Sequence, residues 1–454
     1  MKYYNSVLEL IGRTPLVKLN KISKGLKPII LAKMESHNPG GSVKDRIGLN
    51  MIEAAEREGK LKPGDTIIEA TSGNTGIGLA LVAALKGYKS IFVMTEKASK
   101  EKNNYLKALG AEVVIQPMTA KSGDPDHYVT VAERLAKEIP NSLFLYQYVN
   151  PYNPEAHYKT TGPEIWEDTE GKVTHFVAGV GTGGTISGTG KYLKEKNPNV
   201  KIIGADPYGS IFKVVKETGN TPEPIPYLIE GIGQDIMVEN VQFQYIDEIL
   251  NVNDLDSVEM CKRLSKEEGI FCGGSTGTIA FAAIEIAKQL DENAVIVFTV
   301  CDTGERYLSK YHSDEWLREK RLMNSGHITT GQVFLTKKTS GVPGLISAKS
   351  TDKLFEALEL MDKYNLSTLP VIDGSDCVGS IVEGNVIEKI VNDRNVSGKE
   401  VKHVMDKKLP IVDFNTKFPE TLEMLQKDST LLVSQHGEIK GILTRYDVLD
   451  FIQR

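Results

Sequence analysis

One lysine near the N-terminus follows a turn that is rich in glycine. Residues 38–46 read NPGGSVKDR, and Lys44 falls in the first turn of a helix that we expect over residues 43–58. A lysine at a helix start is unusual because the helix dipole favours anions there. That environment, together with burial, would lower the pKa of Lys44 and favour its action as an amine nucleophile. Taken alone, the fragment fits a solvated surface lysine equally well.

Three further loops each stand at the start of an expected helix and carry small polar residues. Residues 71–76 read TSGNTG and offer hydroxyls, an amide and backbone N–H groups, which suit a carboxylate. Residues 179–185 read GVGTGGT, whose backbone could wrap a phosphate. Residues 272–277 read CGGSTG and could aim a hydroxyl at a ring nitrogen. The simpler interpretation of each loop is a helix cap with turn glycines. The loop at residues 179–185, with Asp206 at the end of the next strand, also half-matches a dinucleotide site.

The elements around these loops follow an alternating pattern. Short β-branched runs alternate with helical patterns such as residues 43–58 and 75–85, which predicts the α/β class with parallel sheets. In such sheets ligands bind beyond the carboxyl ends of the strands, where these loops lie. The expected strands are residues 28–33, 66–69, 90–94, 112–115, 175–179, 201–206 and 294–299.

Taken together, the four loops resemble those of the β-family of pyridoxal-phosphate enzymes and, within it, the cystathionine β-synthases. The resemblance runs from about Val7 to His312 and includes QY at residues 147–148 and EAHY at residues 155–158. It implies a two-lobed fold of type II, similar to the tryptophan synthase β-subunit, with the cofactor in the cleft between the lobes.

The resemblance also implies a role for each residue of the loops. Lys44 would carry pyridoxal 5'-phosphate and act as the catalytic base, Asn74 would contact its phenolic oxygen, and Ser275 its ring nitrogen. The phosphate would be held by Gly181, Thr182, Gly183, Gly184 and Thr185. The substrate would be held by Thr71, Ser72, Thr75, Gln147 and Tyr148. A dinucleotide interpretation leaves Lys44, Asn74 and Ser275 unexplained.

Residues 230–235 read EGIGQD and bear on the choice of reaction. This loop is similar to the cystathionine β-synthase form, and its acids, Glu230 and Asp235 beside Gly231, could meet the amino group of homocysteine. We therefore expect serine and homocysteine to give cystathionine by β-replacement. The alternatives are O-acetylserine as first substrate and a cysteine synthase (O-acetylserine sulfhydrylase). A lyase that mainly releases hydrogen sulfide from cysteine is another.

The pattern changes after the catalytic region, which we expect over residues 1–312. Residues 313–330 read as a linker, and residues 331–454 hold an internal repeat of helix, two strands and helix. The copies, at about 331–395 and 400–454, resemble a pair of CBS motifs (a Bateman module). By that resemblance Thr444 and Asp447 would bind an adenosyl ligand such as S-adenosylmethionine, whereas residues 382–385 (VEGN) lack both groups. The alternative for this module is a packing domain that binds nothing. For the whole chain, the alternative is a non-catalytic adenosyl sensor that retains an inactive enzyme fold.

Composition limits the partners and the compartment. The chain has 454 residues, 40% hydrophobic and 25% charged, with a net charge of -6 and no long basic run. We therefore expect neither nucleic acid nor a membrane as partner. Four widely spaced cysteines fit a reducing cytoplasm, and no metal-ligand spacing occurs. The chain begins close to the catalytic region, so we expect no haem. The lobed fold usually pairs, so a homodimer or larger homo-oligomer is expected.

Overall fold

The computed structural model describes residues 1, 3–71, 73–117, 119–120, 123–322, 329–335 and 345–453. The chain forms two compact units, residues 1–322 and 323–454. Helix α11 (Asp314–Glu319) lies within the expected linker and buries Leu317 in the first unit. Residues 323–328 of that linker lie outside the described residues. Among the described residues, every helix is too short or too polar to cross a bilayer.

The larger lobe of the first unit contains a six-stranded sheet in the order β1-β2-β10-β7-β8-β9. Strand β1 is antiparallel to β2, and all the other neighbours are parallel. The inner strands are almost fully buried, as expected for a sheet with helices on both faces. The strands are β1 (Leu16–Lys18), β2 (Ile29–Lys33), β7 (His175–Gly179), β8 (Lys201–Pro207), β9 (Glu248–Val252) and β10 (Val295–Thr299).

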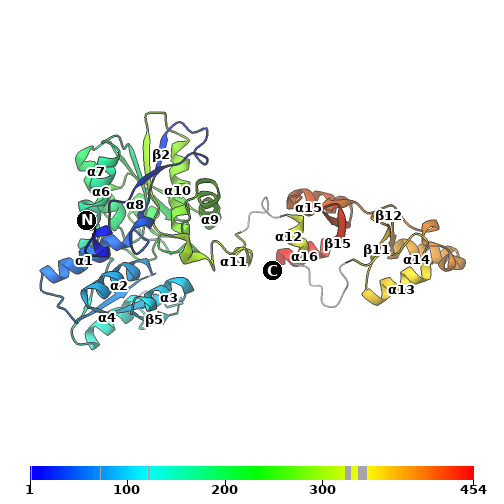
Figure 1. The fold of residues 1–454 in the computed structure, drawn as a ribbon, viewed down its shortest axis with the longest axis horizontal. Coiled ribbons are helices and arrows are strands. Elements are labelled where there is room, and N and C mark those ends of the chain that lie inside the picture. The colour runs from blue at the N-terminus through cyan, green and yellow to red at the C-terminus, as the bar shows by residue number, and fades with distance from the viewer. Residues whose placement is uncertain are drawn as a thin grey trace. The chain divides into compact units, whose positions relative to one another are not determined.

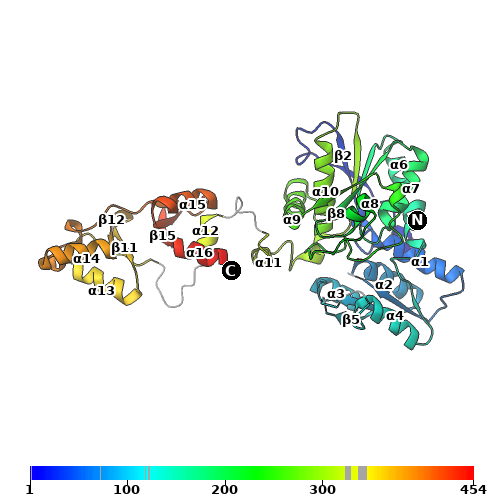
Figure 2. The same cartoon turned by 180° about the vertical axis from the view of Figure 1, so that it is seen from behind.

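The smaller lobe contains a four-stranded parallel sheet in the order β5-β4-β3-β6. Figures 1 and 2 show it with α2, α3 and α4 beside it and with the larger lobe above. One core cluster takes side chains from both sheets, such as Ile68 and Phe176, so the lobes are joined. The strands are β3 (Thr66–Ala70), β4 (Lys89–Thr95), β5 (Glu112–Gln116) and β6 (Ser142–Phe144).

The helices of the first unit alternate with these strands, which confirms the predicted α/β class. They are α1 (Lys44–Arg57), α2 (Asn74–Lys86), α3 (Lys100–Ala108), α4 (Tyr128–Glu138), α5 (Tyr152–Lys159), α6 (Thr161–Asp168), α7 (Gly184–Lys196), α8 (Phe212–Thr218), α9 (Asp254–Arg263), α10 (Gly274–Ala287) and α11.

Helices α1 and α2 pack with their backbones in close contact. A Cβ atom added at Gly48 would lie 2.6 Å from the carbonyl carbon of Gly78, and one at Gly78 would lie 2.6 Å from the carbonyl oxygen of Lys44. Only glycine permits this approach. Because α1 begins at Lys44 and α2 at Asn74, the contact sets the spacing between these two residues of the predicted site.

The second unit repeats a small helix-and-sheet pattern. Its first copy holds α13 (Leu354–Tyr364), β11 (Thr368–Asp373), β12 (Asp376–Val382) and α14 (Glu383–Asn392) around one core. Its second copy holds β13 (Ile411–Asp413), α15 (Phe418–Lys427), β14 (Thr430–Gln435), β15 (Glu438–Thr444) and α16 (Arg445–Gln453) around another. Helix α12 (Thr330–Leu335) packs against α16, because Val333 is buried in the core of the second copy. From the sequence, we had predicted that residues from about 331 onward belong to the first copy.

Candidate active site

Lys44 begins α1, as the sequence predicts, and reaches a pocket in the first unit. The turn before it needs Gly41, whose φ is 74°, and the Ser42 hydroxyl accepts a hydrogen bond from the Lys44 backbone N–H at 3.3 Å. Burial lowers the pKa of Lys44, while Cys301 and Asp302 nearby act in the opposite direction. A larger share of this amine is therefore neutral at physiological pH than in an exposed lysine.

The glycine-rich loop after β7 lines the same pocket with Gly181, Thr182, Gly183 and Thr185. Gly183 has a φ of 82°, and a Cβ atom there would collide with the backbone of Asn240. Helix α7 begins at the next residue, Gly184, so its first backbone N–H groups have no partner within the helix. This combination forms a cradle for a phosphate.

Ser275 and Asn74 stand at the starts of two other helices. Ser275, in the first turn of α10, is buried and lines the pocket with Lys44. Asn74, the first residue of α2, donates from Nδ2 to Asp302 Oδ2 at 2.6 Å and accepts at Oδ1 from Arg306 Nη1 at 2.5 Å. Because an amide nitrogen has two protons, one N–H of Asn74 remains for a ligand.

This set of donors fits pyridoxal phosphate. The amine of Lys44 suits its aldehyde, the Gly181–Thr185 loop suits its phosphate, and the hydroxyl of Ser275 suits its pyridine nitrogen. The structure therefore brings Lys44, the loop and Ser275 together as predicted. Asp302 and Arg306, which hold Asn74, were missed. The polar stretch at residues 301–306 directly after β10 was the available signal, because it lies at a strand's carboxyl end.

The predicted carboxylate-binding residues gather around the start of α2. Thr75 Oγ1 donates to Gln147 Oε1 at 2.6 Å, and Gln147 Nε2 donates to the carbonyl oxygen of Ala70 at 2.9 Å. Thr71 Oγ1 accepts from the backbone N–H of Gly73 at 3.0 Å. Ser72 lies outside the described residues. The remaining N–H of Gln147 and the hydroxyl proton of Thr71 can be donated to a carboxylate, whereas the Thr75 hydroxyl gives its one proton to Gln147 and so holds that side chain in place.

Glu69 contacts this group through the backbone of Gln147 and is fully buried. Its carboxyl group accepts hydrogen bonds from the backbone N–H groups of Ala70, at 3.0 Å, and Gln147, at 3.3 Å. Burial raises the pKa of Glu69 to about 8, against the opposing effect of those N–H groups. Glu69 is therefore mostly neutral at physiological pH and does not repel a carboxylate bound by this group. The sequence analysis missed this residue.

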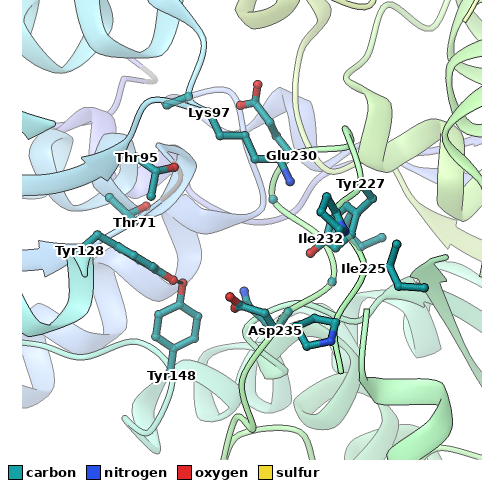
Figure 3. A pocket seen from close by; sticks show the side chains of 16 residues that line it. Thr71, Thr95, Lys97, Tyr128, Tyr148, Ile225, Tyr227, Glu230, Ile232 and Asp235 are labelled. Atoms are coloured by element: carbon teal, nitrogen blue, oxygen red, sulfur yellow. Dashed lines mark hydrogen bonds between the residues drawn. The ribbon is translucent and has the colours of Figure 1, made fainter. Parts of the chain in front are cut away.

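A second pocket of about 320 Å³ adjoins the first, and Gly231 and Ile232 line both. Its volume suits a small molecule. Tyr148, at a predicted substrate position, lines it and shares a hydrogen bond of 2.9 Å with the hydroxyl of Tyr128. Figure 3 shows both tyrosines along one side of this pocket, opposite Ile232 and Tyr227. Residues 224–227 also line it and were not predicted.

The two acids of the 230–235 loop differ in their surroundings. Glu230 is buried, and Oε2 pairs with Lys102 Nζ at 2.9 Å while Oε1 pairs with Lys310 Nζ. The oxygens that were expected to meet a substrate amine are thus held by lysines, whose attraction outweighs burial and lowers the pKa of Glu230. Asp235 is exposed and lines the pocket. Of the two predicted acids, only Asp235 has a carboxylate that faces a ligand without this pairing.

In the second unit, Thr444 and Asp447 lie together at the junction of β15 and α16. Both the backbone N–H of Thr444, at 2.8 Å, and its hydroxyl, at 2.7 Å, donate to Asp447 Oδ2. In the first copy, Val382 and Glu383 stand at the equivalent junction of β12 and α14. The Thr–Asp pair is thus found in the second copy and not at the matching place in the first.

Comparison with known proteins agrees with this geometry. Residues 7–302 match the family described as pyridoxal-phosphate dependent enzyme, and residues 342–392 and 401–454 match the CBS domain. A cystathionine β-synthase of Dictyostelium discoideum is 39% identical over 99% of this chain and 92% of that protein. A cysteine synthase of Staphylococcus aureus is 45% identical over 68% of this chain and 96% of that protein. The structure of an O-acetylserine dependent cystathionine β-synthase from Helicobacter pylori, 39% identical, has a TM-score of 0.63 and covers 68% of this chain and 99% of that one. Pyridoxal phosphate is the cofactor of this enzyme family, and the chain belongs to the cystathionine β-synthases within it.

Proposed function

We propose that the chain is an enzyme that condenses L-serine with L-homocysteine to L-cystathionine by β-replacement. The observation that carries the proposal is the pocket of about 320 Å³ that adjoins the pocket of Lys44. Sulfide, the second substrate of a cysteine synthase, needs no space of that size. The match to cystathionine β-synthases over nearly the whole chain supports the same reaction. Release of hydrogen sulfide from cysteine would be a side reaction of the same site.

The residues of the site divide the work. When bound, pyridoxal phosphate supplies an electron sink next to the α-carbon of the amino acid. Thr71, Thr75 and Gln147 orient the substrate carboxylate. Lys44 Nζ takes the α-proton, for which its lowered pKa suits it. The hydroxyl group then leaves the β-carbon, the thiol sulfur bonds there in its place, and the hydroxyl group and the thiol proton together make one water. Lys44 finally returns its proton to the α-carbon. Ser275 offers a neutral partner to the ring nitrogen, which favours elimination over transamination.

The test is a substrate-pair assay with chromatographic detection of products. We expect the wild type to form cystathionine from serine and homocysteine, and Lys44→Ala to lose at least about 10³-fold in rate, a typical loss for a catalytic acid–base. Lys60→Ala, at an exposed lysine of the same lobe, is the matched control. Activity only with O-acetylserine would change the first substrate, and activity only with O-acetylserine and sulfide would identify a cysteine synthase instead.

We also propose that the second unit binds one adenosyl ligand, such as S-adenosylmethionine, near Thr444 and Asp447. The Thr444 hydroxyl donates to Asp447 Oδ2 at 2.7 Å, which places two oxygen groups side by side for ribose hydroxyls. The absence of both residue types at 382–385 supports a single site. Calorimetric titration of the full chain should show binding of about one ligand per chain. No heat with S-adenosylmethionine would contradict the proposal.

Our proposals on the oligomeric state, the haem content and the cellular compartment rest on the sequence alone. We expect a homodimer or larger homo-oligomer, without nucleic-acid or membrane partners, in the cytoplasm. Light scattering of the purified chain measures the oligomeric state, and cell fractionation tests the cytoplasmic location. We also expect no haem, so the absorption spectrum should show the band of the pyridoxal cofactor without a Soret band.

A further inference from the structure

Lys97 is a cation in the second pocket that the sequence analysis did not consider. It lies between β4 and α3 and is partly buried, and its ammonium group stands over the ring of Tyr227, 4.1 Å from the ring centre. Within the part of the chain that the structure describes, this ammonium group has neither a hydrogen bond nor an ion pair. A cation that has lost water without gaining an anion is destabilised, so the site favours a negatively charged ligand.

The charges around Lys97 leave this end of the pocket positive. Glu230 is the nearest acid of the pocket wall, but both of its oxygens are already held by Lys102 and Lys310. Asp254 also acts on Lys97, while its carboxylate accepts hydrogen bonds from two backbone N–H groups. Three ammonium groups therefore stand against two carboxylates, which leaves a net positive charge. Burial, the largest influence, lowers the pKa of Lys97 to about 8. Lys97 thus remains largely charged at neutral pH and is available to an anion.

The opposite end of the pocket is negative. Figure 3 shows Asp235 across the pocket from Lys97, with the tyrosines 128 and 148 between them along one wall. Lys97, Glu230 and Asp235 are the charged residues that line the pocket. With Glu230 neutralised by its lysines, the pocket presents one cation and one anion at a distance from each other. That pattern is complementary to an amino acid that carries both its ammonium and its carboxylate group.

We propose that Lys97 binds the carboxylate of the thiol substrate while Asp235 binds its ammonium group, so that this pocket selects an amino-acid thiol over sulfide. The inference rests on the proposed function, because it concerns the second substrate of that reaction. It assigns to Lys97 a role in specificity. Charge-assisted hydrogen bonds at both ends would bind the substrate and leave the thiol free for the adjoining pocket.

A panel of thiols separates the two contacts. Homocysteine carries both charges, 4-mercaptobutyrate carries the carboxylate alone, 3-mercaptopropylamine carries the ammonium group alone, and sulfide carries neither. With saturating first substrate, Lys97→Gln should raise the KM for homocysteine and 4-mercaptobutyrate about tenfold or more and change the values for the other two by less than twofold. Asp235→Asn should likewise raise the KM for homocysteine and 3-mercaptopropylamine and leave the other two values nearly unchanged. Lys97→Arg should restore most of the lost affinity.

Control variants and wild-type rates make the outcomes distinct. Lys100→Gln removes a charge from an exposed site three residues away and should leave every KM unchanged. If the wild type uses homocysteine but Lys97→Gln leaves its KM unchanged, or raises all four values equally, the role of Lys97 is refuted. If the wild type forms no product with homocysteine and either serine or O-acetylserine, the proposed function fails and the inference falls with it.

Discussion

The ion pair between Lys102 and Glu230 yields a prediction about the stability of the first unit. Lys102 lies on α3 in the smaller lobe, whereas Glu230 belongs to the loop after β8 and α8 in the larger lobe. Their side chains are 0% and 1% exposed. Lys102 also lies 4.5 Å from the centre of the Tyr307 ring. The pair is thus a buried electrostatic link between the lobes, and its two ends are not equivalent.

Glu230→Gln should be the more damaging change. It leaves two lysines close together, Lys102 fully buried and Lys310 17% exposed, without the carboxylate that they share. Removing one partner of a buried pair costs about 3–5 kcal/mol of unfolding free energy. Lys102→Met leaves Glu230 paired with Lys310 and removes one charge-assisted hydrogen bond, so it should cost about 1.5–3 kcal/mol. The difference between the variants, rather than either value alone, tests the reasoning.

Tryptophan fluorescence during urea unfolding measures this difference. The two tryptophans of the chain, Trp166 and Trp316, both lie in the first unit, so the signal reports that unit. Lysines lower the folded-state pKa of Glu230, so its contribution is complete above the pKa of an unfolded glutamate, about 4.3. The contribution is lost as the pH falls through the folded-state value. Equal losses for both variants, or losses below about 1 kcal/mol, would show that the pair does not hold the lobes.

Three further predictions concern the two units. Gly78→Ala should force α1 and α2 apart at the Lys44 carbonyl and weaken cofactor binding about tenfold, the equivalent of about 1.4 kcal/mol. Equilibrium dialysis measures the affinity for pyridoxal phosphate, and an unchanged affinity would contradict the packing argument. As the pH rises through about 8, Glu69 ionises and repels the substrate carboxylate, so the KM for serine should rise in the wild type and stay level in Glu69→Gln; initial rates on both sides of pH 8 decide this. Asp447→Ala should abolish the calorimetric heat of S-adenosylmethionine binding and leave the ligand-free catalytic rate intact, whereas retained heat would place the ligand elsewhere.

The sequence predicted most of the long elements because their side-chain patterns are local. Strands such as β7 and β8 are runs of apolar residues bounded by polar ones, and each agrees with its predicted range to within one residue. The three-residue strands β1, β6 and β13 were missed. Runs that short carry too little periodicity, and pairing with a longer neighbour defines them. The family resemblance implied two lobes, but it was not predicted which parallel strands belong to which sheet, because the apolar pattern of a strand does not specify its partner.

The same distinction applies to the candidate site, where some residues lie in local motifs and others interact with distant parts of the chain. Lys44, Asn74, the Gly181–Thr185 loop and Ser275 each occur in a short local motif, and the four motifs together could be recognised. The interactions of Glu230 could not be recognised in that way. Its partners, Lys102 and Lys310, lie 128 and 80 residues away along the chain, and neither stands in a distinctive motif. The loop sequence indicated an acid near the substrate, but only the folded chain shows that its charge is already paired.

In the proposed reaction the two substrate positions would bind a carboxylate group by different physical means, and this difference suits a reaction between two amino acids. At the first position the donors Thr71 and Gln147 are neutral, and Glu69, the buried acid that contacts the Gln147 backbone, has a pKa of about 8 and is largely uncharged. A substrate carboxylate bound at this position is therefore neither strongly attracted nor repelled by a charged side chain. At the second position the cation Lys97 stands across the pocket from an acid. Short neutral hydrogen bonds fix the geometry of the first substrate, whose α-carbon must face Lys44. An ion pair acts over a longer range, so it tolerates a flexible thiol substrate of which only the sulfur atom must be placed. If that division holds, removing the two kinds of contact should have different kinetic effects. Neutralising Lys97 should raise the KM for the thiol, whereas removing a neutral donor such as the Thr71 hydroxyl should lower kcat.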